Sequence, residues 1–143
     1  DILNSKYQFL SGSEKFEKSL DFVQSMDSID KWNFFSVDAP NIKRLDKPSQ
    51  EILEKVGFSF AIDHHPNDVP MAKMHYADIK SASCSLILWQ LHLLLLDFDA
   101  YNPTPEQIKD IANCCYTGLV SETGGFAFQN TAAESLFYAS KMV

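Results

Sequence analysis

The chain has 143 residues, of which 45% are hydrophobic and six are prolines, and this is enough for one domain with a sizeable core. Its formal net charge of −7 excludes a broad groove for a long nucleic-acid duplex, because such affinity comes largely from Lys and Arg. A small phosphorylated ligand stays compatible with this charge if bound cations cancel it locally.

The beginning of the chain carries no signal-peptide pattern, and Asp1 opens it without a Met, which favours a piece of a longer protein. The longest apolar stretch, Ser83 to Leu96, is interrupted by Gln90 and His92, so we expect no membrane span. The three cysteines are an odd number and two of them are neighbours, which indicates free core thiols and a reducing cytoplasm.

The first predicted element is an amphipathic helix over Glu14 to Met26, with Ser13 as its N-cap and apolar residues at three- and four-residue spacing. A buried strand follows over Trp32 to Val37. It stops at Asp38, and the next residues, Ala-Pro-Asn, are typical of a turn.

A short helix over Pro48 to Val56 comes next, closed by Gly57, and a second strand over Phe58 to Ile62 runs into an Asp-His-His sequence. This strand-helix-strand order predicts parallel neighbouring strands, so Asp38 and Asp63 should emerge at the same edge of the sheet. Ligands of open α/β sheets bind at that carboxyl edge.

The second half of the chain predicts one short strand and three helices. We expect a third strand near Met74 to Ala77, then a leucine-rich helix from about Ser81 and a helix from Thr104 to about Thr117. A glycine-rich loop, Gly118 to Thr131, and a last helix, Ala132 to Val143, complete the chain. The predicted fold class is α/β, with a mainly parallel sheet flanked by helices in a Rossmann-like arrangement.

Five residues form the candidate site: Asp38, Asp63, His64, His65 and Glu122. Carboxylate oxygens and imidazole nitrogens suit Mn²⁺ and related divalent ions. Taken singly, Asp38 fits a turn-forming Asp and Glu122 fits an ordinary loop acid. The consecutive Asp63, His64 and His65 favour a metal or acid/base site, because adjoining histidine and carboxylate side chains are typical of such sites. His75 and His92 are solitary, which favours a surface or core-edge role.

Three segments carry a resemblance to a known family. They are Val37-Asp38 with Arg44 downstream, Phe60 to Asn67, and Tyr116 to Phe126. These segments resemble the second, third and fourth motifs of DHH phosphoesterases, and most closely the branch of nanoRNases and pAp phosphatases. The resemblance covers nearly the whole chain and implies a single, incomplete DHH phosphoesterase domain over residues 1–143.

The resemblance implies that Asp38, His64 and Glu122 are metal ligands, and that Asp63 and His65 orient the site or meet the substrate phosphate. Glu122 departs from the Asp that the family usually carries there. The first motif would lie upstream of Asp1, and the family's C-terminal substrate domain lies beyond this chain. We therefore expect the chain alone to bind metal weakly, to turn over little and to associate through its open sheet edge, with a homodimer as one outcome.

The function that this resemblance implies is Mn²⁺-dependent hydrolysis of phosphate esters in small nucleotides, with Mg²⁺ or Co²⁺ as alternative ions. The substrates would be very short RNA, pAp or a cyclic dinucleotide, and no long duplex or membrane would take part. Two readings stay open beside it. One is inorganic pyrophosphate or polyphosphate hydrolysis, and the other is a non-catalytic nucleotide-binding module.

Overall fold

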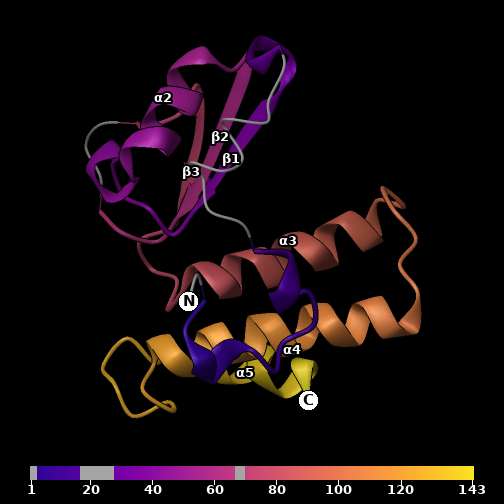
Figure 1. Cartoon of the computed structure of the whole chain (residues 1–143). Coiled ribbons are helices and arrows are strands. Elements are labelled where there is room, and N and C mark those ends of the chain that lie inside the picture. The colour runs from indigo at the N-terminus through magenta and orange to yellow at the C-terminus, as the bar shows by residue number, and fades with distance from the viewer. Residues whose placement is uncertain (1–2, 17–27, 67–69) are drawn as a thin grey trace. The chain divides into compact units, whose positions relative to one another are not determined.

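The computed structural model describes residues 3–16, 28–66 and 70–143, which fall into two compact units (Figure 1). Unit 1 comprises Asp1–Gln8 and Gly12–Ile79, and unit 2 comprises Phe9–Ser11 and Lys80–Val143. Most of the helix predicted over Glu14 to Met26 lies outside the described residues. Within its described start, Ser13–Lys15 forms a 3-10 turn with Gly12 at the N-cap position and no side-chain cap.

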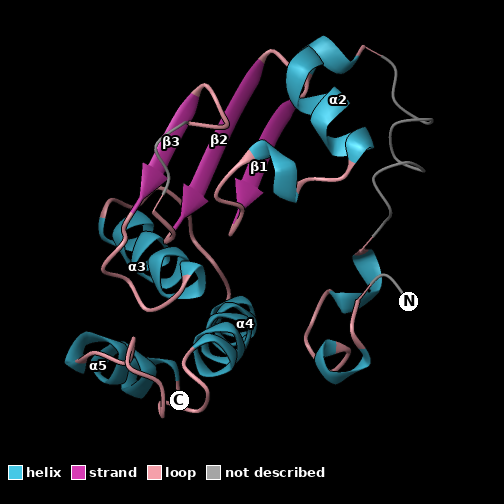
Figure 2. Cartoon of the chain, turned by 90° about the vertical axis from the view of Figure 1, so that its left-hand side faces the viewer, coloured by secondary structure: helices cyan, strands magenta, loops and turns pink. Residues whose placement is uncertain are grey.

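Unit 1 contains a three-stranded parallel sheet in the order β1-β2-β3 (Figure 2). The strands are β1 (Asn33–Val37), β2 (Phe58–Asp63) and β3 (Met74–Ala77), and α2 (Lys47–Lys55) connects the first two. Short 3-10 helices complete the unit: η1 (Ser5–Tyr7), η2 (Ser13–Lys15), η3 (Ile29–Lys31) and η4 (Ile42–Arg44). The predicted βαβ order, the parallel pairing and the α/β fold class are therefore confirmed.

Helix α2 begins where local side chains satisfy its first backbone donors. The carboxylate of Asp46 accepts a hydrogen bond from the N–H of Ser49 at 2.9 Å, and Pro48 occupies the first turn, where no N–H is needed. Ile52 and Leu53 are its buried residues, and the helix ends one residue before the predicted Val56. The sequence prediction was thus correct to within one residue at each end.

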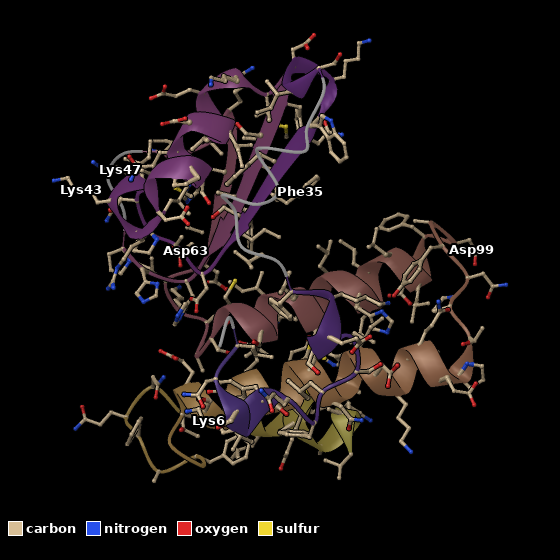
Figure 3. The ribbon with its side chains drawn as sticks, in the orientation of Figure 1. Lys6, Phe35, Lys43, Lys47, Asp63 and Asp99 are labelled. Atoms are coloured by element: carbon tan, nitrogen blue, oxygen red, sulfur yellow. The ribbon has the colours of Figure 1, made fainter. Side chains whose placement is uncertain are left out.

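Strand β1 differs from the buried strand that the sequence predicted. Of its five residues only Ser36 is buried, while Phe35 is 67% exposed (Figure 3). Among the described residues β1 is an edge strand, and its alternate side chains lie on opposite faces of the sheet. An aromatic run signals a strand, but it does not say how much of that strand the rest of the fold covers.

Unit 2 consists of three helices: α3 (Cys84–Asp97), α4 (Pro105–Glu122) and α5 (Ala133–Met142). The Ser83 side chain caps α3, and Thr104 with Gln107 forms a capping box at the start of α4. One cluster of buried residues joins the three helices: Ala82, Leu86, Trp89, Ala112, Cys115, Leu119, Ala139 and Met142. The core of unit 2 is thus contiguous.

The prediction that Gly118 opens a loop was wrong, because α4 continues through it to Glu122. A Cβ built on Gly118 would lie 2.8 Å from the Cβ of Ser85 and closer still to its hydroxyl. The lack of a side chain at Gly118 therefore allows α4 to approach α3 closely, and the glycine does not break the helix. Glu122 is consequently a helix-terminal residue and not a loop residue.

Other sequence predictions for unit 2 have clear outcomes. The three cysteines are free thiols, and Cys84 and Cys115 are buried while Cys114 is half-buried. His92 is buried, its Nδ1 is hydrogen-bonded to the Tyr101 hydroxyl, and burial lowers its pKa. Within the described part of the chain, no helix combines the length and apolarity that a bilayer crossing requires.

Candidate metal centre

The two predicted aspartates lie at the carboxyl ends of the neighbouring strands β1 and β2. Val37 pairs with Ile62, so the next residues along each strand, Asp38 and Asp63, lie side by side at the edge of the sheet. β2 extends through Asp63, one residue beyond the prediction, because the carbonyl of Asp63 accepts a hydrogen bond from the N–H of Asp78 at 3.1 Å.

Asp38 leaves the strand in the left-handed region, with φ of 60°. Among residues other than glycine, Asp and Asn are enriched there, so the side-chain type fits the backbone. The N–H of Asp38 still donates to the carbonyl of Ile62 at 3.0 Å, which ties the turn to β2. This bond holds the Asp38 backbone at the end of β2, from which the two histidines extend.

Asp63 is fully buried and organises the residues that follow it. Its Oδ1 accepts from the backbone N–H groups of His64 and His65, at 2.7 and 3.2 Å, and lies 2.8 Å from Nδ1 of His65. Burial alone would raise the pKa of Asp63, but the hydrogen bonds from His65 and His64 outweigh it and lower the pKa. Asp63 is therefore held as a carboxylate.

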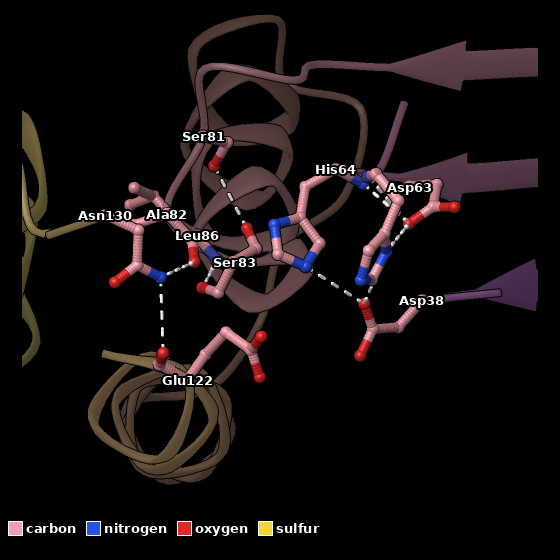
Figure 4. A network of polar contacts seen from close by, with 10 residues as sticks. Asp38, Asp63, His64, Ser81, Ala82, Ser83, Leu86, Glu122 and Asn130 are labelled. Atoms are coloured by element: carbon pink, nitrogen blue, oxygen red, sulfur yellow. Dashed lines mark hydrogen bonds and ion pairs between the residues drawn. The ribbon is translucent and has the colours of Figure 1, made fainter. Parts of the chain in front are cut away.

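The histidines complete a cluster around these carboxylates. Nε2 of His64 lies 3.4 Å from Oδ1 of Asp38 (Figure 4). Nδ1 of His65 lies 3.9 Å from the same oxygen. The side chains differ in access: His64 is 10% exposed, His65 39% and Asp38 52%. One ligand atom from each of the four residues lies within 4.8 Å of the others.

This donor set fits a divalent cation. Two ligands at right angles on one ion, each about 2.1 Å from it, are about 3 Å apart, close to the 3.4 Å between Asp38 and His64. Oδ2 of Asp63 is buried and has no hydrogen-bond partner among the described residues, although a buried carboxylate oxygen normally has one. A cation would supply the missing interaction.

The structure thus brings four of the five predicted site residues together in unit 1. The fifth, Glu122, is the last residue of α4 in unit 2, and it is an exposed residue. Its role as a ligand stays a prediction. Sequence reasoning also missed a residue that contacts Glu122: the side-chain amide of Asn130 donates to the Glu122 carbonyl at 3.2 Å. An Asn in a polar loop gives no signal of such a contact.

Comparison with known proteins extends the sequence resemblance. The chain matches no protein-family model. It is 30% identical over 135 residues to the bifunctional oligoribonuclease and PAP phosphatase NrnA of Bacillus subtilis. This match covers 89% of this chain and 40% of that protein. A protein of the same name from Thermus thermophilus is 30% identical over 88 residues, or 61% of this chain and 24% of the relative.

A solved structure supports the fold. The crystal structure of an exopolyphosphatase-related protein from Bacteroides fragilis matches 97% of this chain and 39% of that one, with a TM-score of 0.79 and 20% sequence identity. The chain therefore spans about two fifths of the length of the Bacillus subtilis relative and of this structure. These findings confirm the resemblance that the motifs indicated: along most of its length, this chain is similar to part of the oligoribonuclease and PAP phosphatase proteins of the DHH phosphoesterase family.

Proposed function

We propose that this protein hydrolyses phosphate esters in small nucleotides, such as a very short RNA, pAp or a cyclic dinucleotide, with Mn²⁺ as the preferred ion. The observation that carries the proposal is the cluster of Asp38, Asp63, His64 and His65 at the sheet edge. The names of the relatives, which combine oligoribonuclease and PAP phosphatase, support the substrate class. The net charge of −7 favours a short substrate over a long strand.

We assign Asp38, His64 and Glu122 as metal ligands. Bound divalent ions would activate a water and stabilise the oxygens of a phosphoryl displacement. Mg²⁺ and Co²⁺ are the alternative ions, since oxygen and imidazole donors accept them as well. The ligand role of Glu122 follows from its place in the fourth motif, and its extra methylene relative to Asp extends the reach of the carboxylate.

We assign His65 to the substrate phosphate and Asp63 to the orientation of His65. The 2.8 Å contact with Oδ1 of Asp63 favours a proton on Nδ1 of His65 and directs Nε2 away from that carboxylate. In its doubly protonated form His65 would donate from Nε2 to a phosphate oxygen. The greater exposure of His65 than of His64 fits this division of roles.

The remaining assignments belong to the same proposal. The three free thiols favour a reducing compartment, and we place the protein in the cytoplasm. We also propose self-association, with a homodimer as the simplest form, because the sheet exposes Phe35, Val37, Met74 and Tyr76. The activity is proposed for the intact protein, while the 143-residue chain alone is expected to bind Mn²⁺ weakly and to turn over little.

The test is a substrate panel with the intact protein after removal of metal by a chelator. We expect no turnover until Mn²⁺ is restored, and then hydrolysis of a diribonucleotide and pAp. Hydrolysis of pyrophosphate or polyphosphate alone would contradict the proposal in favour of phosphoanhydride chemistry. Binding of the nucleotides without turnover would indicate a non-catalytic module.

A further inference from the structure

The C-terminal end of α4 carries a negative charge that does not stabilise the helix. Glu122 is the last helical residue, and the final turn contains no basic side chain. Helix C-termini carry a partial negative charge, so a carboxylate there is unfavourable. Helix stability therefore does not explain an acid at this position.

The backbone around Glu122 is nevertheless closely held. The N–H of Gly125 donates to the carbonyl of Val120 at 2.8 Å and that of Gly124 to the carbonyl of Ser121 at 3.4 Å, as in a Schellman motif. Both glycines have positive φ, and a Cβ on Gly124 would lie 2.5 Å from the Phe128 ring. Within the described part of the chain, no backbone N–H donates to the Glu122 carbonyl.

Asn130 supplies that donor and, at the same time, a second hydrogen bond. Its side-chain nitrogen donates to the Glu122 carbonyl at 3.2 Å and to the Ala82 carbonyl at 3.1 Å (Figure 4). An amide NH₂ has two hydrogens, so both bonds can form together. Ala82 is buried and directly precedes Ser83, the N-cap of α3. Asn130 therefore ties the end of α4 to the start of α3, both in unit 2.

We propose that Asn130 is a positioning residue for the carboxylate of Glu122. This inference rests on the proposed function, in which Glu122 is a metal ligand. By holding the Glu122 carbonyl against the start of α3, Asn130 fixes the Cα from which the long Glu side chain extends. A ligand whose backbone is fixed loses less freedom when it binds an ion, so the metal site gains affinity.

The test compares Asn130→Ala with Gln90→Ala in the intact protein. Gln90 is the matched control, because its side-chain amide also joins two helices of unit 2, donating to Glu134 at 2.9 Å, without touching Glu122. The measurements are Mn²⁺ affinity by titration calorimetry and the thermal unfolding midpoint. We expect Asn130→Ala to weaken Mn²⁺ binding about tenfold, as outer-shell changes do, and Gln90→Ala to leave it unchanged.

A double-mutant cycle with Glu122→Gln separates positioning from simple helix capping. If Asn130 acts through Glu122, adding Asn130→Ala to Glu122→Gln should change Mn²⁺ affinity by less than about twofold. A lower unfolding midpoint for Asn130→Ala with unchanged Mn²⁺ affinity would overturn the positioning role and leave the ligand role of Glu122 intact. Unchanged affinity in Glu122→Gln alone would overturn the ligand role and this inference with it. Asn130→Ser, which keeps one donor, serves the same comparison if the alanine variant does not fold.

Discussion

The two units of this chain bury different kinds of side chain. In unit 2 the buried cluster is largely apolar and runs through three helices, with Leu86 and Leu119 almost fully enclosed. In unit 1 the most deeply buried side chains include the carboxylate of Asp63, whereas the most deeply buried polar side chains of unit 2, Thr123 and Ser135, carry no charge. Burying a carboxylate oxygen costs free energy unless it is hydrogen-bonded, and Oδ2 of Asp63 has no hydrogen-bond partner among the described residues, so this oxygen is not explained by stability.

This contrast predicts which property of the protein a substitution in each unit should change. Changes at the polar strand ends of unit 1 should alter metal binding and turnover with little effect on folding. Changes in the apolar cluster of unit 2 should alter the free energy of unfolding. Four predictions test this separation, beginning with the largest effect.

The largest effect is expected for Asp38→Asn and His64→Ala. Asn keeps the size of Asp and tolerates the positive φ, so the fold should persist while the charge is lost. In the intact protein, Mn²⁺-dependent turnover should fall by more than about 100-fold, since even outer-shell residues of metal sites typically matter 10- to 100-fold. His75→Ala is the control, because this histidine lies on β3 outside the cluster. Equal turnover in the three variants would remove Asp38 and His64 as essential ligands.

In unit 2, Leu119→Ala should destabilise the protein by about 2–5 kcal/mol through a cavity in the apolar cluster. Leu136→Ala on α5 removes the same atoms from a half-exposed side chain and should cost about 0.5 kcal/mol or less. Urea unfolding of both variants measures the difference. If the two variants lost equal stability, the apolar cluster would not be the source of stability in unit 2.

A smaller loss is expected for Gly118→Ala. Alanine favours helix by about 1 kcal/mol over glycine, but overpacking against Ser85 costs about 1–3 kcal/mol, so net destabilisation should result. Chemical denaturation measures the change. Adding Ser85→Gly should recover part of the loss by removing the atoms that clash. A stabilised Gly118→Ala protein would show that α3 and α4 can separate without cost.

The smallest effect concerns the pH dependence of unfolding. Burial lowers the pKa of His92 from its usual 6.5, so the unfolded chain binds a proton before the folded one does. Its stabilising contribution is therefore complete above pH 6.5 and is lost as the pH falls through the pKa of the folded state. His92→Gln should flatten the fall in unfolding free energy between pH 7 and pH 5. An unchanged slope in this variant would assign the pH dependence to other groups.

Much of unit 1 could be predicted from local patterns. The strand-helix-strand order indicated a parallel pair, and the acidic residues after both strands were therefore expected at one edge, because parallel strands end on the same side. The third strand was predicted with its observed bounds, Met74–Ala77. Such signals need only neighbouring residues, so a single sequence contains them.

Other features depend on residues far apart in the chain, and only the tertiary structure decided them. Position 118 inside α4 is a glycine because Ser85, 33 positions earlier, leaves no room for a side chain there. Asn130 matters through a carbonyl 48 positions away, at Ala82. The orientation of Asp38 likewise depends on a backbone bond to Ile62 on another strand. Residue type and spacing determine which elements form, whereas the close contacts between those elements determine what each residue does.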